Sequence, residues 1–286
     1  MRFRTEIESI KACFELGHAD KMVLLGSCFT DEVGSRLAAD GFDVCANPFG
    51  ALYNPMSICQ CIDRILSGEA YSEADLTLGP RGYHCLDYAT RYSGADIAAL
   101  LGVLNDDASR LREALCAGPT VFLTFGTAYV YRLREDGRVV GNCHKFPAGD
   151  FDRRLLSVDE IVAAVSDSLH RMRDAGVRRV VFTVSPIRHV ADGLHGNTVS
   201  KAVLHLAVER LCAEWDGFVS YFPAYEMMID DLRDYRFYAA DMKHPSDVAV
   251  DYIYEFFSHT YFNADTRREA VEYRRQYKAS LHRPIL

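Results

Sequence analysis

The chain has 286 residues, of which 49% are hydrophobic, so it can bury a large core and does not belong to the disordered class. Its formal net charge is −8, and no lysine and arginine cluster offsets it, which excludes a protein that binds nucleic acid through the phosphate backbone. No apolar run approaches the roughly 20 residues that span a bilayer, and the charged first residues lack the apolar core of a signal peptide. We therefore expect a cytoplasmic protein with no membrane partner.

Short apolar runs alternate with amphipathic segments along the chain. Residues 21–25 predict a strand buried on both faces, and residues 33–39 predict the start of a helix. Further strands are predicted at 42–46, 120–125, 178–184 and 217–222, and further helices at 56–66, 94–116, 157–175, 197–215 and 248–257. Residues 129–141 have the pattern of a β-hairpin, whereas residues 68–93 show little periodicity and are expected to form an irregular loop region.

This alternation predicts an α/β fold, with a mostly parallel five-stranded sheet covered by helices on both faces. We treat residues 1–286 as a single domain, in which the charged tail at 263–286 begins as a helix and lies at the periphery. Ligands of such sheets bind outside the carboxyl ends of the strands, so side chains that follow the strands are the candidates for a site.

The strongest candidates for chemistry are Ser27, Asp241 and His244. Ser27 follows the first strand, where the N-terminus of the next helix can hold an oxyanion, although a serine in such a turn is by itself more often a helix cap. Asp241 and His244 are three residues apart before the last strongly apolar helix, so one short turn can present both side chains. His244 would then be the general base, and Asp241 would hold its ring.

Five other residues could bind substrate or stabilise an oxyanion. Gly50, in a loop made rigid by two prolines, either directs its N–H at the site or is a plain turn glycine. Asn142 and His144 end the hairpin, where Asn142 could donate to an oxyanion and His144 could bind substrate. Arg188 and His189 follow the fourth strand, and Arg188 could either clamp an anionic group or form a structural ion pair.

The nine cysteines are scattered, and their odd number favours buried free thiols over a disulfide framework. Cys28 is set apart from the others because it adjoins the candidate nucleophile. Cys143 and His144 could also bind a metal, but no second pair stands at zinc spacing. We therefore expect no metal and no other cofactor.

With these motifs the chain resembles the GSCFA family, whose name describes the turn found here as Gly26-Ser27-Cys28-Phe29, with Thr30 in place of the final alanine. The resemblance covers nearly the whole chain through segments 47–50, 126–129, 142–145, 185–189 and 241–245. That family is similar to the SGNH (GDSL-like) hydrolases. The similarity implies a three-layer α/β/α, flavodoxin-like fold with strand order 2-1-3-4-5, here with an inserted hairpin.

Carried over by position, the resemblance makes Ser27 the nucleophile, Gly50 the oxyanion glycine, and Asp241 with His244 the acid and base. The superfamily block Gly-x-Asn-Asp reads here Gly126-Thr127-Ala128-Tyr129, so the asparagine of the oxyanion hole is missing. The loss of one such donor costs roughly 10²–10³ in rate. Asn142, with His144 behind it, is the candidate substitute.

The resemblance implies a serine-dependent esterase that hydrolyses a small acyl ester, for example an O-acetyl group on a carbohydrate. Two alternatives stay open at this point. An acyltransferase would use the same triad, and a ligand-binding protein that has lost catalysis would account for the missing asparagine. The partner is in each case a small molecule, and the oligomeric state is left open.

Overall fold

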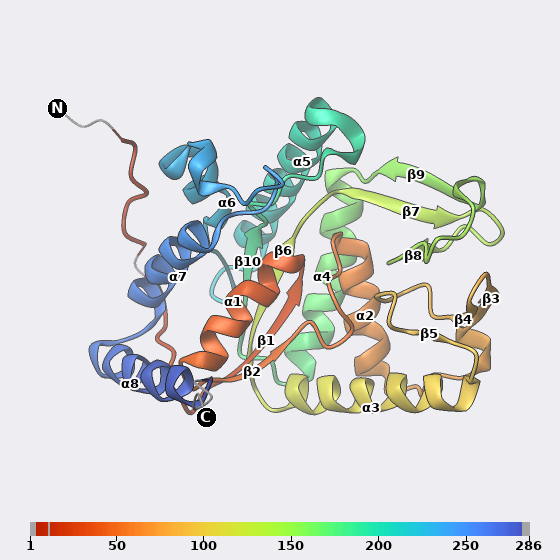
Figure 1. Cartoon of the computed structure of the whole chain (residues 1–286), viewed down its shortest axis with the longest axis horizontal. Coiled ribbons are helices and arrows are strands. Elements are labelled where there is room, and N and C mark those ends of the chain that lie inside the picture. Colours follow the sequence, from red (N-terminus) through yellow and green to blue (C-terminus); the bar gives the residue numbers. More distant parts are fainter. Residues whose placement is uncertain (1–3, 11, 282–286) are drawn as a thin grey trace, which may run out of the picture.

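A five-stranded parallel sheet forms the centre of the protein (Figure 1), whose computed structural model describes residues 4–10 and 12–281. Its strands are β1 (Lys21–Gly26), β2 (Asp43–Ala46), β6 (Thr120–Phe125), β10 (Arg179–Val184) and β11 (Val219–Tyr221). They are arranged in the order β2-β1-β6-β10-β11, and every neighbouring pair is parallel. In chain order this is 2-1-3-4-5, so the expected fold class is confirmed.

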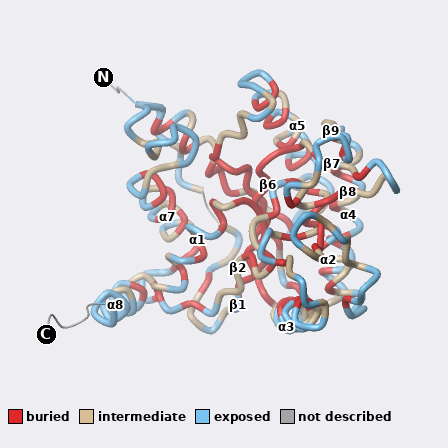
Figure 2. Tube along the Cα trace, turned by 45° about the vertical axis from the view of Figure 1, so that its right-hand side comes forward, coloured by how far each residue is buried: buried red, intermediate tan, exposed pale blue. Residues whose placement is uncertain are grey.

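Helices cover both faces of the sheet, as Figure 1 shows. One layer contains α2 (Pro55–Ser67), α3 (Ile97–Cys116), α4 (Val158–Asp174) and α5 (Gly193–Glu214), and the other contains α1 (Cys28–Ala39), α7 (Asp247–Tyr261) and α8 (Ala264–Leu281). Because side chains of a strand alternate between faces, Val23 and Leu25 of β1 join the first core, and Met22 and Leu24 join the second. The buried parts of the trace are accordingly concentrated along the central strands (Figure 2).

Two small antiparallel sheets are inserted between the main strands. The expected hairpin is β7 (Tyr129–Leu133) with β8 (Val139–Val140), and a third strand, β9 (Phe151–Leu155), pairs with the other side of β7. The second insertion consists of β3 (Thr77–Gly79), β4 (Gly82–His84) and β5 (Ser93–Gly94). The expectation of an irregular loop at 68–93 was therefore wrong, because strands of two or three residues are too short to show periodicity.

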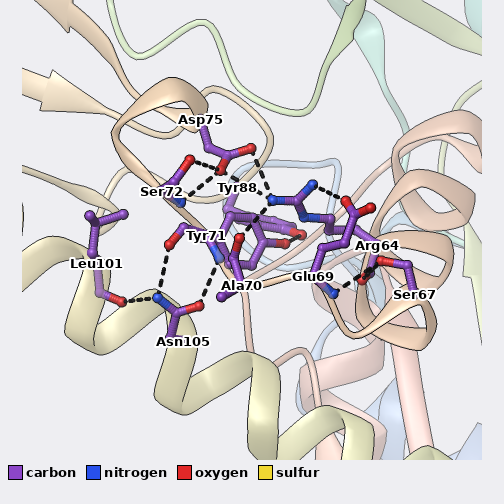
Figure 3. A network of polar contacts seen from close by, with 10 residues as sticks. All are labelled: Arg64, Ser67, Glu69, Ala70, Tyr71, Ser72, Asp75, Tyr88, Leu101 and Asn105. Carbon is purple, nitrogen blue, oxygen red and sulfur yellow. Dashed lines mark hydrogen bonds and ion pairs between the residues drawn. The ribbon is translucent and has the colours of Figure 1, made fainter.

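The segment that leads into the second insertion is held to the helices by a polar network around Arg64 (Figure 3). The guanidinium of Arg64, near the end of α2, donates to Glu69, to the carbonyl of Ala70 and to Asp75, and it lies over the ring of Tyr71. From α3, the side-chain amide of Asn105 exchanges hydrogen bonds of 2.8 and 3.1 Å with the backbone of Tyr71. The segment between α2 and β3 is thus held from two helices.

The remaining short elements connect β10, β11 and α7. They are the helix α6 (Ala224–Glu226), the π-helical turn Met227–Leu232 and the 3₁₀ turns Val190–Asp192 and Tyr235–Phe237. Elsewhere in the chain, a 3₁₀ turn at Glu73–Asp75 precedes β3, and another at Ala148–Asp150 precedes β9. The predicted helical start of the tail is α8, whose Arg274 donates to both carboxylate oxygens of Asp40 at 2.6 Å. The last five residues of that tail lie outside the described residues. Within the part of the chain that is described, no helix combines the length and apolarity needed to cross a bilayer.

Candidate active site

The carboxyl ends of the central strands face a cavity of about 490 Å³. The start of α1 and the loops after β2, β6 and β10 contribute to its lining, together with the three-stranded sheet of β7, β8 and β9 and the loop before α7. Four of the residues that matter for chemistry here are Cys28, Tyr53, His189 and His244. A cavity at this edge of the sheet is where an α/β fold of this kind places its ligand site.

Asp241 and His244 lie on one tight turn before α7. The Nδ1 atom of His244 is 2.5 Å from Oδ2 of Asp241, and Oδ1 of the same carboxylate accepts the backbone N–H groups of Lys243 and His244, both at 3.0 Å. The N–H groups of His244 and Lys243 and the imidazole all stabilise the charged carboxylate, so the pKa of Asp241 is lowered far below its usual value. With Nδ1 turned to an ionised carboxylate, the Nε2 atom is left to accept a proton.

The side chain that meets Nε2 of His244 is the thiol of Cys28, with Sγ at 3.4 Å. Cys28 is the first residue of α1, and it lines the cavity beside His244. The sequence indicates this turn as part of a site, but the structure places Cys28, and not Ser27, at the histidine.

Ser27 is fully buried, and its hydroxyl and backbone N–H form hydrogen bonds with residues other than His244. Its hydroxyl donates to Oγ of Ser185 at 2.9 Å, and its backbone N–H donates to the carbonyl of Thr124 at 3.1 Å. These bonds join the end of β1 to the ends of β6 and β10. The pairing of Ser27 with His244 that the resemblance implied is therefore not found, because the serine is the N-cap residue, and its side chain turns inward.

The N–H of Gly50, which was expected to hold an oxyanion, is also engaged in another hydrogen bond. The N–H of Gly50 donates to the carbonyl of Asn47 at 2.7 Å, and the glycine has a φ of 82°, in the left-handed region. The space at Gly50 is restricted as well, since a Cβ there would come within 2.5 Å of the Cβ of Ala89. Gly50 thus has the geometry of a turn glycine, and its N–H closes that turn.

Asn142 and His144 are directed away from the cavity and toward the second insertion. Asn142 accepts the N–H of His144 at 2.8 Å and donates to Thr90 at 3.3 Å, and Nε2 of the buried His144 lies 3.0 Å from the carbonyl of Tyr88. Burial lowers the pKa of His144. These contacts do not support Asn142 as the substitute for the missing asparagine, because both the oxygen and the nitrogen of its side-chain amide form hydrogen bonds with other residues.

Arg188 and His189 do line the cavity. Nε2 of His189 is buried without a hydrogen-bond partner among the described residues, and burial, with the positive charge of Lys201 second, lowers the pKa of His189 to about 4. His189 is therefore neutral near pH 7, and one of its ring nitrogens can donate. Gly126 makes room for it, since a Cβ at Gly126 would lie 2.9 Å from His189 Nε2.

Two residues with a bearing on the site were missed by the sequence reasoning. Tyr53 stands in the proline-flanked loop and lines the cavity with Cys28, and its hydroxyl lowers the pKa of the Cys28 thiol. Lys201 of α5 is fully buried, with Nζ at 2.7 Å from the carbonyl of Gly126 and 2.6 Å from that of Ser185. The tyrosine could have been noticed as a polar side chain in a rigid loop after a strand; nothing in the sequence distinguishes this lysine.

Replacing Tyr53 by phenylalanine is expected to raise the pKa of the Cys28 thiol, because the hydroxyl lowers that pKa by stabilising the thiolate. Alkylation by iodoacetamide at a fixed pH below that pKa should slow by roughly two- to tenfold, as expected for one hydrogen bond. The rate is measured against pH by mass spectrometry of the modified peptide. Tyr131→Phe, which changes another tyrosine of the cavity lining, is the control and should leave the rate unaltered.

Within residues 4–10 and 12–281, no group of three or more histidine, cysteine, aspartate or glutamate side chains is arranged to hold a metal ion.

The profile of the GSCFA family matches residues 21–257, which include the sheet, the cavity and the Asp241–His244 turn. The chain belongs to the GSCFA family. No curated protein sequence gives a significant match.

Several solved structures resemble this one, and three of them follow. A carbohydrate esterase of family 3 from Talaromyces cellulolyticus is 11% identical, with 88% of this chain and 99% of that chain covered and a TM-score of 0.40. An acylhydrolase named as putative, from Bacteroides fragilis, is 10% identical over 90% and 91% of the two chains, with a TM-score of 0.45. A mutant of an acetyl-xylooligosaccharide esterase from Geobacillus Stearmophilus is 12% identical over 86% and 96%, with a TM-score of 0.44.

Proposed function

We propose that this protein is an ester hydrolase that removes small acyl groups, with His244 as general base and Asp241 as the residue that orients it. One observation carries the proposal: an ionised carboxylate holds one nitrogen of His244, and the other nitrogen faces a nucleophilic side chain at the start of α1, inside a cavity. This arrangement of nucleophile, base and orienting acid is the one that acyl transfer requires.

The charge of the cavity supports a polar or anionic alcohol as the other half of the ester. Arg153, Arg188 and Lys243 are in its lining, which contains no acidic side chain among the described residues. Arg153 is paired with Asp192, whereas no carboxylate partner is found for Arg188 in the same part of the chain. An acylated carbohydrate, which offers hydroxyl groups and where substituted an anionic group, fits this lining better than a long apolar acyl chain.

The test is hydrolysis of short-chain p-nitrophenyl esters by the wild type and by His244→Ala. Removal of the general base is expected to lower kcat roughly 10²–10⁴-fold. His259→Ala changes an exposed histidine of α7 and should retain the wild-type rate. An inactive wild type, over acetyl to butyryl esters, or a His244→Ala variant that remains fully active, would contradict the proposal.

A ligand-binding protein without turnover is the second candidate. It is favoured by the N–H groups of Ser27 and Gly50, which donate to the carbonyls of Thr124 and Asn47 and cannot donate to an oxyanion as well. This alternative predicts that an acetylated sugar binds, that no acetate is released, and that His244→Ala leaves Kd unchanged. Calorimetry combined with an acetate assay on the same samples separates the two functions.

A further inference from the structure

We propose that the nucleophile is the thiol of Cys28, not the hydroxyl of Ser27, so that the acyl group is carried on the protein as a thioester. This inference rests on the proposed function and identifies the atom that does its first step. It is carried by the positions of the two neighbouring side chains relative to the histidine.

Cys28 has the contacts that a nucleophile needs. Its Sγ is 3.4 Å from Nε2 of His244, the nitrogen that Asp241 leaves free, which completes a cysteine–histidine–aspartate sequence of contacts. The residue is half-buried and lines both the cavity and a second pocket, which also includes His244, Ala239 and Pro245. A substrate can therefore reach the sulfur.

Ser27 has none of these properties. It is 0% exposed, it does not line the cavity, and its hydroxyl hydrogen is given to Ser185. Ser185 in turn accepts the N–H of Ile187 at 3.3 Å. The serine thus joins β1 to the loop after β10, across the end of β6, and so supports the turn that presents Cys28.

The charges around the sulfur show how it would be activated. Burial raises the pKa of the Cys28 thiol, and the carboxylates of Asp31 and Glu32 act in the same direction, whereas its own backbone N–H and the Tyr53 hydroxyl lower it. The thiol is therefore protonated in the resting site and needs a base at the moment of attack. This distinguishes it from cysteines that are stable thiolates beside a cation.

The reaction balances with these groups and water alone. His244 Nε2 takes the thiol proton while Sγ bonds to the ester carbonyl carbon, and the carbonyl electron pair moves to the oxygen. Collapse of this intermediate breaks the carbon–oxygen bond, and the departing alcohol receives the proton from His244. A water molecule then gives a proton to His244 and attacks the thioester, and the sulfur leaves, to be reprotonated by the same imidazole.

The experiment is to mix the protein with p-nitrophenyl acetate, quench it in acid, and locate the acetyl group by intact and peptide mass spectrometry. The acetyl group is expected on Cys28, and neutral hydroxylamine should remove it, because hydroxylamine cleaves thioesters under conditions in which oxygen esters persist. Cys28→Ala should form no acetyl-protein and lose at least roughly 10³-fold in kcat, as for loss of a nucleophile.

Further variants test whether the acetyl group is carried by Cys28. Ser27→Ala should still form the acetyl-protein on Cys28, and Cys28→Ser should give an acetyl group that resists hydroxylamine. Cys143→Ser, which changes another half-buried cysteine whose pKa is raised by burial, is the control for general loss of thiols and should behave as the wild type. Circular dichroism and Tm of each variant show whether it is folded, and Ser185→Ala, which removes the partner of Ser27, replaces Ser27→Ala if that variant does not fold.

The outcomes separate this inference from the proposed function. An acetyl group on Ser27, or full turnover by folded Cys28→Ala, overturns the cysteine assignment and leaves the hydrolase intact. A wild type that neither hydrolyses the ester nor acquires an acetyl group overturns the hydrolase, and the assignment with it.

Discussion

Replacement of Asp241 by asparagine is expected to lower kcat by roughly 10⁴-fold while leaving the fold intact. The carboxylate now fixes the tautomer of His244, because Oδ2 lies 2.5 Å from Nδ1 and can only accept. An asparagine can turn its NH₂ toward Nδ1, which would move the ring proton to Nε2 and remove the base. Its remaining oxygen can still accept the N–H groups of Lys243 and His244, so the turn should persist.

Steady-state kinetics on a p-nitrophenyl ester, with Tm as the measure of folding, tests this expectation. Asp247→Asn is the matched control, because Asp247 is a neighbouring aspartate in the first turn of α7 with a 93% exposed side chain, 3.8 Å from Arg36. That variant should differ from the wild type by less than twofold or so, as expected for an exposed ion pair. A loss of less than tenfold in Asp241→Asn would show that the carboxylate does not control the tautomer.

The layers of this fold follow from patterns that are local in the sequence. The run at residues 21–25 has apolar side chains for both faces of β1, and the helices recur with a period that gives each an apolar face. The order of the strands in the sheet could not be predicted from such patterns, because it depends on contacts between segments that are far apart in the sequence. It was available only through the resemblance to a family.

The edge of the sheet at which the site lies could also be predicted, since it follows from the parallel arrangement. Which of two adjacent residues faces His244 could not be. Ser27 has extended backbone angles as the N-cap of α1, and Cys28 is already helical, so their side chains leave the turn in different directions. A difference of one residue at a helix start is within the uncertainty of any boundary taken from sequence, yet it decides which atom meets the base.

Asn142 and His144 show a second limit of predicting a site from sequence. Their polar character at the end of a hairpin suggested a site, but the direction of that hairpin is set by β9, which pairs along the whole of β7. The N–H of Asn142 then donates to the carbonyl of Leu86, in the second insertion. Neither contact is local, so no pattern within residues 129–147 could have indicated it.

Replacement of Lys201 is expected to have a large effect on stability and not on turnover. Between pH 7 and pH 9 the free energy of unfolding of the wild type should rise by roughly 2 kcal/mol relative to that of Lys201→Met. Burial, with the charge of Arg188 second, lowers the pKa of Lys201 from 10.5 to about 7 in the folded protein. Between these two values the unfolded chain holds a proton that the folded chain has released. Unfolding then takes up a proton, so the free energy of unfolding rises with pH, by up to about 1.4 kcal/mol per pH unit.

The titration of the neighbouring histidines does not obscure the pH dependence of the free energy of unfolding. His189 and His205 both have their pKa lowered by burial, and the Lys201 charge acts in the same direction, so they titrate below the range of the measurement. Urea unfolding of the wild type and Lys201→Met at pH 7, 8 and 9 gives the difference directly. Lys278→Met, which changes an exposed lysine of α8, should show no such trend.

A pH-independent difference would mean that Lys201 remains charged in the folded state throughout this range. The result matters for the site because the same amine holds the carbonyls of Gly126 and Ser185, the first residues after β6 and β10. A neutral amine can still donate to both carbonyls, so loss of the proton removes the cost of a buried charge without breaking this connection. The strand ends that support Ser27 and, through it, the Cys28 turn should therefore be held more stably above pH 7 than below it.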